Sequence, residues 1–287
     1  MLQSFKEFSK QIDEALITFG KKAYPKFGQV VILAGGAGSG KGFTLSNLLG
    51  IEGKVFDVDA LKELAMKSTV FSKRVKDEIG RDITKMNLKD PKEVADLHVI
   101  LSDVYGLTKN HKNSAYSSIL LVDPRRKPNL IFDVTLANMK KLEDVSRDVQ
   151  QMGYKKEDIH VVWVMNDVKI AMKQNLERDR VVPDNILMGT HKGAAISMSK
   201  IISDSEYTQQ HMNGDIWIAF NKRGVDSEIV FSSQKGGLKG DKSGGSYILK
   251  SNIIKIKEKG KKAKSRDDLP TEMFKKIKDY APKSVDF

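Results

Sequence analysis

The chain has 287 residues, of which 40% are hydrophobic and 30% charged, a composition that fits one large α/β domain or one domain with an appendage and contains no apolar run near the ~18 residues of a membrane span. It has no cysteine, which excludes disulfides, cysteine–zinc sites and thiol catalysis, and we expect a cytoplasmic protein without a membrane partner. Lysine and arginine exceed aspartate and glutamate by 49 − 37 = 12, which favours a nucleic acid or another phosphate-bearing partner, with lysine enrichment for solubility as the alternative.

The first element that the sequence predicts is an amphipathic helix within residues 1–27. Its apolar residues recur at helical spacing, so they share one face. They are Leu2, Phe5, Phe8, Ile12, Leu16 and Phe19. We expect this helix to pack on the core of the protein.

A strand, a glycine-rich turn and a helix come next. The apolar run 29–34 predicts a parallel strand covered on both faces, and residues 43–49 predict the helix. The turn GGAGSGKG lets successive backbone N–H groups point at one anion, and the helix adds the positive end of its dipole. A lysine in this place reaches the β- and γ-phosphates of a nucleoside triphosphate. The predicted ATP-binding residues are Gly35, Gly36, Ala37, Gly38, Ser39, Gly40, Lys41, Gly42 and Phe43, and Lys41 is also predicted to be catalytic.

One position departs from the usual phosphate-binding loop. Gly42 stands where a serine or threonine normally contacts Mg²⁺. The loop resembles that of adenylate kinase and its relatives, which also place glycine after the lysine, although here Phe43 intervenes before Thr44. The resemblance implies a small-molecule or nucleotide kinase, with Mg²⁺ held by ATP, waters and carboxylates elsewhere in the chain.

The second predicted strand, 54–57, leads into a predicted helix at 59–67. A carboxylate at the carboxyl end of a strand beside the phosphate loop lies where substrates bind in such sheets. Asp59 and Lys62 are three residues apart and share a helix face. We predict that Asp59 is a catalytic residue that accepts the proton of an attacking hydroxyl, and that Lys62 binds substrate. The alternative for Asp59 is a helix N-cap.

Residues 70–115 are predicted to be mainly helical, and the next strand, 129–134, ends in an aspartate. An apolar run closed by Asp133 is typical of a Walker B carboxylate, which orients Mg²⁺ or its waters, so Asp133 is the predicted metal residue. A turn that begins with aspartate is the alternative. Thr135 and Asn138 follow and are predicted substrate contacts.

A helix at 138–152, a strand at 159–165 and a helix at 167–178 complete an alternation of strands and helices over residues 28–180. This alternation predicts an α/β fold with a doubly wound, mostly parallel sheet. Because the phosphate loop follows the first strand of that sheet, we predict that this α/β sheet has the P-loop kinase fold.

Two arginines follow the last of these helices. Arg178 and Arg180 fall between that helix and a second one marked by Pro183, as the arginines of a lid would. Phosphoryl transfer needs positive charge over the oxygens of the migrating group, and both arginines are therefore predicted to be catalytic. The alternative is that they are surface arginines paired with Glu177 and Asp179.

The C-terminal part begins with a further predicted strand at 215–220. Residues 247–256 resemble a strand that could pair with 227–232 as a hairpin, and a short helix is predicted near 270–280. These elements follow the alternating part of the chain, so we expect a β-hairpin and helix extension.

A lysine-rich stretch at 255–264 is expected to behave as a tail outside the core, because it is polar and a flexible glycine-rich loop precedes the predicted strand at 247–256. The expected organisation is therefore an N-terminal helix (1–27), a P-loop kinase domain (28–220) and a basic C-terminal extension (221–287).

Residues 129–200 resemble the zeta-toxin and polynucleotide-kinase-like group of P-loop kinases. The segments that carry the resemblance are Phe132-Asp133-Val134-Thr135, Met152-Gly153-Tyr154, Val162-Trp163-Val164 and the stretch from Asn175 to Pro183. In that group an aspartate after the second strand, with a basic residue three positions later, acts as the base, and Asp59 and Lys62 match it. Lid arginines follow the fourth strand, as Arg178 and Arg180 do. The resemblance covers roughly residues 28–200.

The function that the sequence favours is an ATP-dependent kinase that uses Mg²⁺ and transfers the γ-phosphate to a hydroxyl. The acceptor is a nucleic acid, a nucleotide or a nucleotide sugar, and the sequence leaves these open. One alternative is a nucleotide-binding switch or assembly protein without phosphotransfer. Another is a structural component whose basic C-terminal part binds a polyanion.

Overall fold

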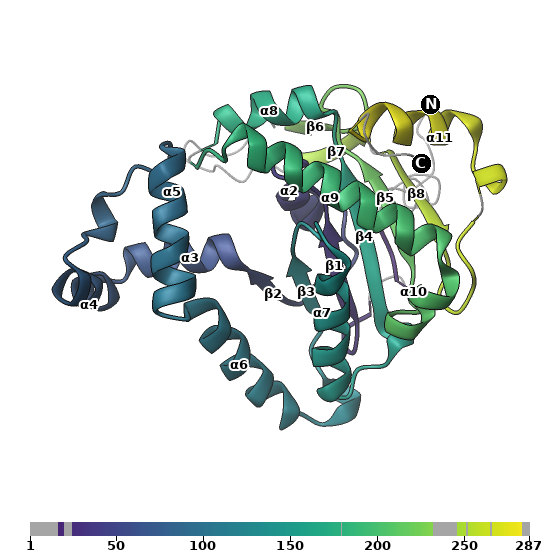
Figure 1. Cartoon of the computed structure of the whole chain (residues 1–287). Coiled ribbons are helices and arrows are strands. Elements are labelled where there is room, and N and C mark those ends of the chain that lie inside the picture. Colours follow the sequence, from purple (N-terminus) through teal and green to yellow (C-terminus); the bar gives the residue numbers. More distant parts are fainter. Residues whose placement is uncertain are drawn as a thin grey trace, which may run out of the picture.

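A six-stranded sheet in the order β2-β3-β1-β4-β5-β8 runs through the molecule (Figure 1). The structure is a computed structural model that describes residues 17–19, 25–178, 180–231, 246–250, 252–264 and 266–282. β2, β3, β1, β4 and β5 are parallel neighbours, and β8 pairs with β5 in the antiparallel direction. The doubly wound, mostly parallel sheet is therefore confirmed. Its strands are β1 (Val30–Ala34), β2 (Lys54–Asp57), β3 (Leu130–Asp133), β4 (Ile159–Met165), β5 (Ile216–Phe220) and β8 (Asn252–Lys257).

Helices cover both faces of this sheet. On one face Val30, Ile32 and Ala34 of β1 are fully buried and join the larger core cluster. On the other face Val31 and Leu33 pack with residues of a second cluster. Burial on both faces explains why β1 is apolar throughout. The helices are α2 (Lys41–Asn47), α3 (Val58–Lys67), α4 (Thr69–Ile79), α5 (Pro91–His98), α6 (Leu107–Leu120), α7 (Met139–Gln151), α8 (Val168–Leu176), α9 (Asp184–Ser203), α10 (Ser205–His211) and α11 (Thr271–Tyr280).

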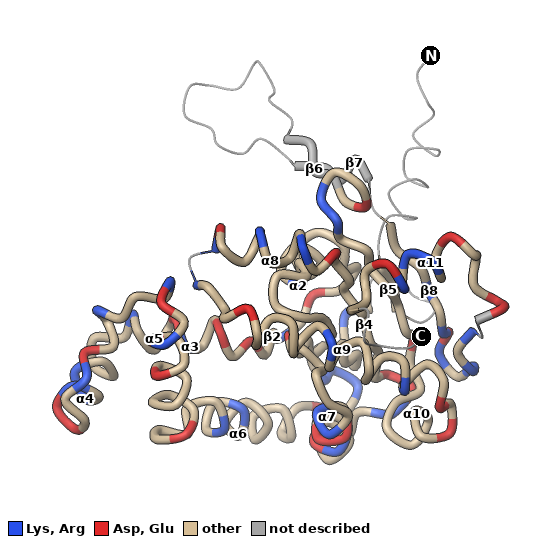
Figure 2. Tube along the Cα trace, turned by 45° about the horizontal axis from the view of Figure 1, so that its top comes forward, with Lys and Arg blue, Asp and Glu red and all other residues tan. Residues whose placement is uncertain are grey.

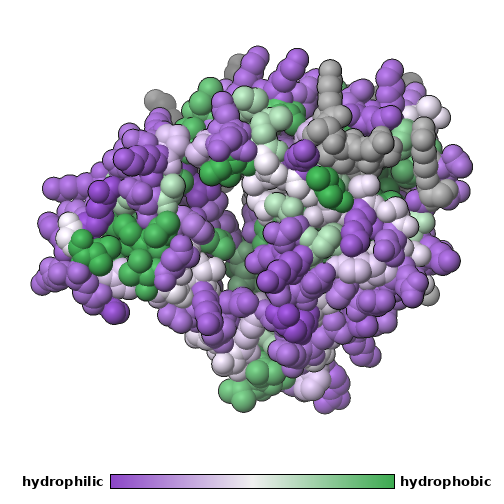
Figure 3. Space-filling model, viewed as in Figure 1, coloured by the Kyte–Doolittle hydropathy of each residue, from purple (hydrophilic) through white to green (hydrophobic). Residues whose placement is uncertain are grey.

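The helices between β2 and β3 form a lobe that projects to the left in Figure 1. The lobe consists of α3, α4, α5, a π-helical segment (Val99–Val104) and α6. It has its own buried cluster, in which Val75, Ile83 and Leu101 take part. The mainly helical prediction for this region is confirmed. In the space-filling view the surface is hollowed between this lobe and the rest of the molecule (Figure 3).

The N-terminal helix predicted for residues 1–27 lies mostly outside the described residues. Within the described part, Ile17 and Phe19 are buried in the second core cluster. Ile17 forms an isolated parallel bridge with Leu49, and its N–H donates to the carbonyl of Leu48 at 2.7 Å. In the part of the chain that the structure covers, no helix combines the length and the apolarity that a membrane span needs.

The C-terminal part completes the sheet. The predicted hairpin exists as β6 (Glu228–Phe231) paired with β7 (Ser246–Lys250), but β8 continues beyond it and pairs with β5. α11 contributes Ile277 and Tyr280 to the larger core cluster. A boundary at residue 220 therefore separates paired strands of one sheet.

The expectation that the lysine-rich stretch lies outside the core is wrong. Ile256 is fully buried, and Lys257 is only 3% exposed, with its ammonium donating to the carbonyl of Gly214 at 2.9 Å. Lys255 is paired with Asp215, and Lys259 with Asp158. Basic and acidic residues accordingly lie side by side around β8 and α11 (Figure 2). The predicted strand at 247–256 includes most of β8, but its pairing with β5 was not expected, because charged residues alternate with its isoleucines.

We predict that Ile256→Ala lowers the free energy of unfolding by about 2–5 kcal/mol, because it leaves a cavity at a fully buried position. The matched control is Ile196→Ala on α9, where the side chain is 49% exposed and the loss is expected to stay below about 1 kcal/mol. Urea unfolding followed by circular dichroism measures both. Equal, small effects of the two substitutions would mean that β8 is not part of the cooperative core.

Candidate active site

The loop between β1 and α2 is closely packed by chain segments from elsewhere in the fold. Gly40 has φ +92°, a left-handed conformation that favours glycine, and a Cβ there would overlap the side-chain amide of Asn221. A Cβ on Gly38 would press on the carbonyl oxygen of Ala171 in α8. These contacts give a physical reason for glycine at both positions. They also fix the loop against β5 and α8.

The helix α9 holds the other side of the loop. The N–H of Ala37 donates to the hydroxyl of Thr190 at 3.2 Å, and Nε2 of His191 donates to the carbonyl of Ala37 at 2.8 Å. Burial lowers the pKa of His191, against the effect of its bond to Ala37, so the ring is neutral with its proton on Nε2. A Cβ on Gly36 would overlap this ring. The ring therefore requires glycine at that position.

Lys41 begins α2 and folds back over the loop. Its ammonium donates to the carbonyl oxygens of Gly35 at 3.0 Å and Gly36 at 3.4 Å, and lies 3.7 Å from a carboxylate oxygen of Asp133. The hydroxyls of Ser39 and Thr44 are buried and have no hydrogen-bond partner among the residues that the structure describes. Gly42 has open space where a side chain would stand.

Carboxylates gather at the ends of β2 and β3. Asp57 and Asp133 are in register, so they lie at the same level of the sheet. Asp57 caps α3 by accepting the N–H of Asp59 at 2.8 Å, which shows that Asp57, and not Asp59, is the N-cap. Burial raises the pKa of Asp133, and the nearby Asp57 and Asp59 add to the rise while Lys41 opposes it.

Asp59 forms the centre of an ion cluster with Arg180 and Lys62. Both guanidinium N–H₂ groups of Arg180 donate to it, one at 2.6 Å, and Lys62 lies 3.5 Å away. Burial raises the pKa of Asp59, but Arg180 and Lys62 outweigh it, and the pKa ends below its usual value. The carboxylate is therefore ionised at neutral pH. The stabilisation that this pairing gives the fold is complete above the ordinary pKa and is lost as the pH falls through the lowered one.

The segment that carries the arginines is held in place by Asn175, which is fully buried near the end of α8. Its amide donates to the carbonyl of Val182 at 2.7 Å and accepts the N–H of that residue at 3.0 Å. The N–H of Val181 donates to Leu88 of the lobe at 3.0 Å. Arg178 is exposed, and its charge helps to lower the pKa of Asp59. The structure thus brings this segment and the lobe together.

The remaining predicted residues lie nearby with structural partners. The carbonyl of Thr135 accepts the N–H of Gly35 at 3.2 Å. The side chain of Asn138 caps α7 by accepting the N–H of Lys141 at 3.2 Å. Phe43 packs on the second core cluster.

Sequence reasoning missed three residues at the site: Asp57, Thr190 and Asn221. Only Asp57, which ends a predicted strand, offered a local signal in the sequence.

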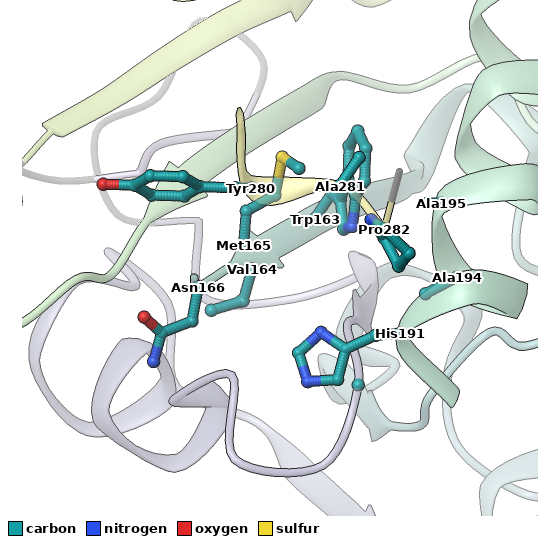
Figure 4. Close-up of a pocket in the computed structure, with 11 residues that line it drawn as sticks. Trp163, Val164, Met165, Asn166, His191, Ala194, Ala195, Tyr280, Ala281 and Pro282 are labelled. Atoms are coloured by element: carbon teal, nitrogen blue, oxygen red, sulfur yellow. The ribbon is translucent and has the colours of Figure 1, made fainter. Parts of the chain in front are cut away.

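A small pocket opens beside the loop, between β4, α9 and the end of α11 (Figure 4). It is lined by Gly36, Trp163, Val164, Met165, Asn166, His191, Ala194, Ala195, Tyr280, Ala281 and Pro282. Its volume of about 10 Å³ accommodates roughly one water and no nucleobase. The pocket is therefore too small to hold a nucleotide.

No family model matches the chain, and a search of curated proteins finds no match. Similar solved structures include the AvrRxo1-ORF1:AvrRxo1-ORF2 complex with sulphate ions, at 11% identity and a TM-score of 0.48, covering 91% of this chain and 66% of that chain. The same complex with ATP gives 11% identity and a TM-score of 0.45, over 98% of this chain and 73% of that one.

Another similar structure comes from the PezAT chromosomal toxin-antitoxin system of the human pathogen Streptococcus pneumoniae. It is 12% identical at a TM-score of 0.40, and the alignment covers 76% of this chain and 77% of that chain. This chain spans slightly less than two thirds of the first AvrRxo1 chain. At these identities and TM-scores the structures are similar to this chain and identify neither its activity nor its partners.

We predict opposite effects of alanine at two glycines of the loop. Gly40→Ala should destabilise the protein and weaken ATP binding, because it combines a strained backbone with an overlap on Asn221. Gly42→Ala should keep ATP binding and raise the free energy of unfolding by roughly 0.5 kcal/mol, because it lies in a helix with open space around it. Thermal unfolding and calorimetric titration with MgATP test both. Equal effects at the two positions would contradict the loop geometry.

Proposed function

We propose that the chain is an ATP-dependent kinase that transfers the γ-phosphate of ATP to a hydroxyl group. The observation that carries the proposal is the convergence of three parts at one edge of the sheet. These are the glycine loop with Lys41, the carboxylate of Asp133 within 3.7 Å of that lysine, and the Asp59–Arg180–Lys62 cluster. A phosphate cradle, a metal-orienting carboxylate and a proton acceptor beside cations are the parts that phosphoryl transfer needs.

In this proposal the loop N–H groups and Lys41 bind the phosphates of ATP. Among the residues that the structure describes, no three or more His, Cys, Asp or Glu side chains lie together so that they could hold a metal ion. Mg²⁺ generally binds through one or two carboxylates, substrate phosphates and waters, and the half-buried Asp133 fits that role. When bound with ATP, Mg²⁺ would neutralise charge on the phosphates. Gly42 lacks the hydroxyl that usually contacts Mg²⁺ in such loops, so the phosphates of ATP and the carboxylate of Asp133 would supply more of the ligands.

The transfer itself exchanges one phosphorus–oxygen bond for another. The acceptor oxygen bonds to the γ-phosphorus while the bond from that phosphorus to the β–γ bridging oxygen breaks, and ADP leaves. The acceptor proton passes to the carboxylate of Asp59. The lowered pKa of Asp59 belongs to its pairing with Arg180, and a loose transition state places little demand on the strength of the base once that pair has opened.

Arg180 has to leave Asp59 before that carboxylate can accept a proton. The γ-phosphate offers the guanidinium a second, doubly ionised partner, so binding of ATP favours the exchange. Arg180 and the exposed Arg178 would then stabilise the transferring group. Lys62 stays beside Asp59 and contacts the acceptor. Thr135 and Asn138 are further proposed contacts of the acceptor. The hollow between the lobe and the rest of the molecule is the space in which we place the acceptor (Figure 3).

The proposed acceptor is a compound that carries both a phosphate and a hydroxyl group: a nucleic acid, a nucleotide or a nucleotide sugar. The pairing of Lys255 and Lys259 with aspartates weakens the argument that the C-terminal lysines bind a polyanion. The kinship with the zeta-toxin and polynucleotide-kinase-like group is part of the same proposal, as is a cytoplasmic location. A nucleotide-binding switch without transfer is the second candidate, and the missing hydroxyl at Gly42 favours it.

Lys41→Ala should weaken ATP binding by about 10- to 100-fold and abolish transfer without unfolding the protein, because it removes a charged donor to the phosphates. Lys67→Ala, on an exposed part of α3, is the control and should leave both unchanged. The test uses γ-labelled ATP in single turnovers with nucleic-acid ends, nucleoside monophosphates and nucleotide sugars as acceptors. Unchanged transfer by the Lys41 variant would exclude the assigned role of the loop. Tight ATP binding by the wild type without transfer to any acceptor would favour the switch.

Asp59→Asn is nearly isosteric but cannot take a proton. We expect transfer to fall by about 10²-fold or more, while ATP binds at least as tightly as in the wild type because Arg180 is released. Asp82→Asn, in the lobe and away from the loop, controls for the loss of one negative charge. Quenched single-turnover assays measure the rate of transfer, and calorimetric titration measures the affinity for ATP. A loss of ATP affinity with an unchanged rate would show that Asp59 organises the fold and does not act on the acceptor.

A further inference from the structure

We infer that Asn221 is a positioning residue for the phosphate-binding loop, and that α11 holds Asn221 in its working orientation. The inference rests on the proposed function, since it concerns how the loop binds ATP. It assigns to the C-terminal part of the chain a role in nucleotide affinity.

The first step is the contact between Asn221 and the loop. Asn221 follows β5 directly and is 7% exposed. Its amide donates to the carbonyl of Ser39 at 3.0 Å, and its own N–H donates to the carbonyl of Met165 at 2.8 Å. The space next to Gly40 is filled by the same amide. Asn221 thus touches the loop where the loop enters α2.

The second step follows from the geometry of a peptide bond. The carbonyl of Ser39 and the N–H of Gly40 belong to one trans peptide unit, so they point in opposite directions. Holding the carbonyl on Asn221 therefore turns the N–H of Gly40 away from Asn221. That N–H has no hydrogen-bond partner within the described part of the chain, which leaves it available for a phosphate oxygen.

The third step concerns the orientation of the Asn221 amide. The hydroxyl of Ser227 donates to Oδ1 of Asn221 at 2.6 Å, so the nitrogen, and not the oxygen, faces Ser39. Between these residues the chain makes a turn in which the N–H of Asp226 donates to the carbonyl of Lys222 at 2.7 Å. The turn thus decides which end of the amide meets the loop.

The fourth step links that turn to α11 through Asp226, whose side chain is fully buried. It accepts hydrogen bonds from Tyr280 at 2.5 Å, from Lys276, and from Asn252 at 3.3 Å. Burial and the bond to Asp226 raise the pKa of Tyr280, which keeps its hydroxyl as a donor. A buried carboxylate that loses its partners is costly, so the turn and α11 are coupled. The end of α11 also lies beside a small pocket that Gly36 of the loop helps to line, and Figure 4 shows Tyr280, Ala281 and Pro282 around it.

The test compares Asn221→Asp with Asn129→Asp in calorimetric titrations with MgATP, well below the unfolding temperature. Asn129 is a matched control, since it is also buried and its amide donates to backbone carbonyls, those of Pro25 at 2.7 Å and Glu52 at 2.9 Å. We expect both variants to lose thermal stability. Only Asn221→Asp should weaken ATP binding, by about tenfold or more, because an acceptor replaces the donor to Ser39.

The link to α11 is tested with Tyr280→Phe against Tyr154→Phe, whose hydroxyl donates to the carbonyl of Pro128 at 2.6 Å, far from the loop. Tyr280→Phe should weaken ATP binding by about threefold, Tyr154→Phe should not, and the effects of Tyr280→Phe and Asn221→Asp should be non-additive.

The outcomes distinguish a failure of the proposed function from a failure of the inference alone. If the wild type binds no ATP, the proposed function fails and the inference falls with it. If the wild type binds ATP and Asn221→Asp binds equally well, only the inference is overturned. Should Asn221→Asp fail to fold, Ser227→Ala replaces it, since it frees the amide to turn. ATP affinity equal to that of the wild type in Ser227→Ala would then refute the inference.

Discussion

Parallel pairing of β2, β3 and β1 puts Asp57, Asp133 and Leu33 at the same level of the sheet. Because all parallel strands end at one edge, the glycine loop that follows β1 opens beside the carboxylates that follow β2 and β3. A slip of one residue in β3 would turn Asp133 to the opposite face and away from Lys41. The geometry of the proposed site therefore depends on the register in which β3 pairs with β1 and β2.

Parts from distant regions of the chain then surround the loop. α9 holds it at Ala37, α8 approaches Gly38, and the residue after β5 contacts Ser39. Across the hollow, Arg180 connects the segment after α8 to Asp59 at the base of the lobe. In this structure the bidentate pair neutralises the proposed base and occupies the proposed transition-state arginine. In the proposed mechanism, one exchange of partners by Arg180 prepares both groups, and the arrival of the γ-phosphate is thereby coupled to activation of the acceptor.

Local patterns in the sequence predicted much of this arrangement. The strand–loop–helix around Lys41, the strand that ends in Asp133 and the helix that carries Asp59 and Lys62 all involve neighbours in the chain. The contacts that hold the loop do not, since Arg180–Asp59, Thr190–Ala37 and Asn221–Ser39 join residues 121, 153 and 182 positions apart. β8 was missed as a core strand for a different reason. Its lysines resemble a solvated tail, and the hydrogen bonds that Lys257 donates to Asn213 and Gly214, just before β5, explain how this lysine lies in the core.

The measurement that tests this account most directly is phosphorus NMR of the wild-type chain with ATP, Mg²⁺ and a mixture of hydroxyl acceptors. The account predicts that ADP appears together with an equal amount of a new phosphomonoester, since the γ-phosphorus ends on an acceptor oxygen. Appearance of ADP with inorganic phosphate alone, or no change in a sample that binds ATP, would contradict it.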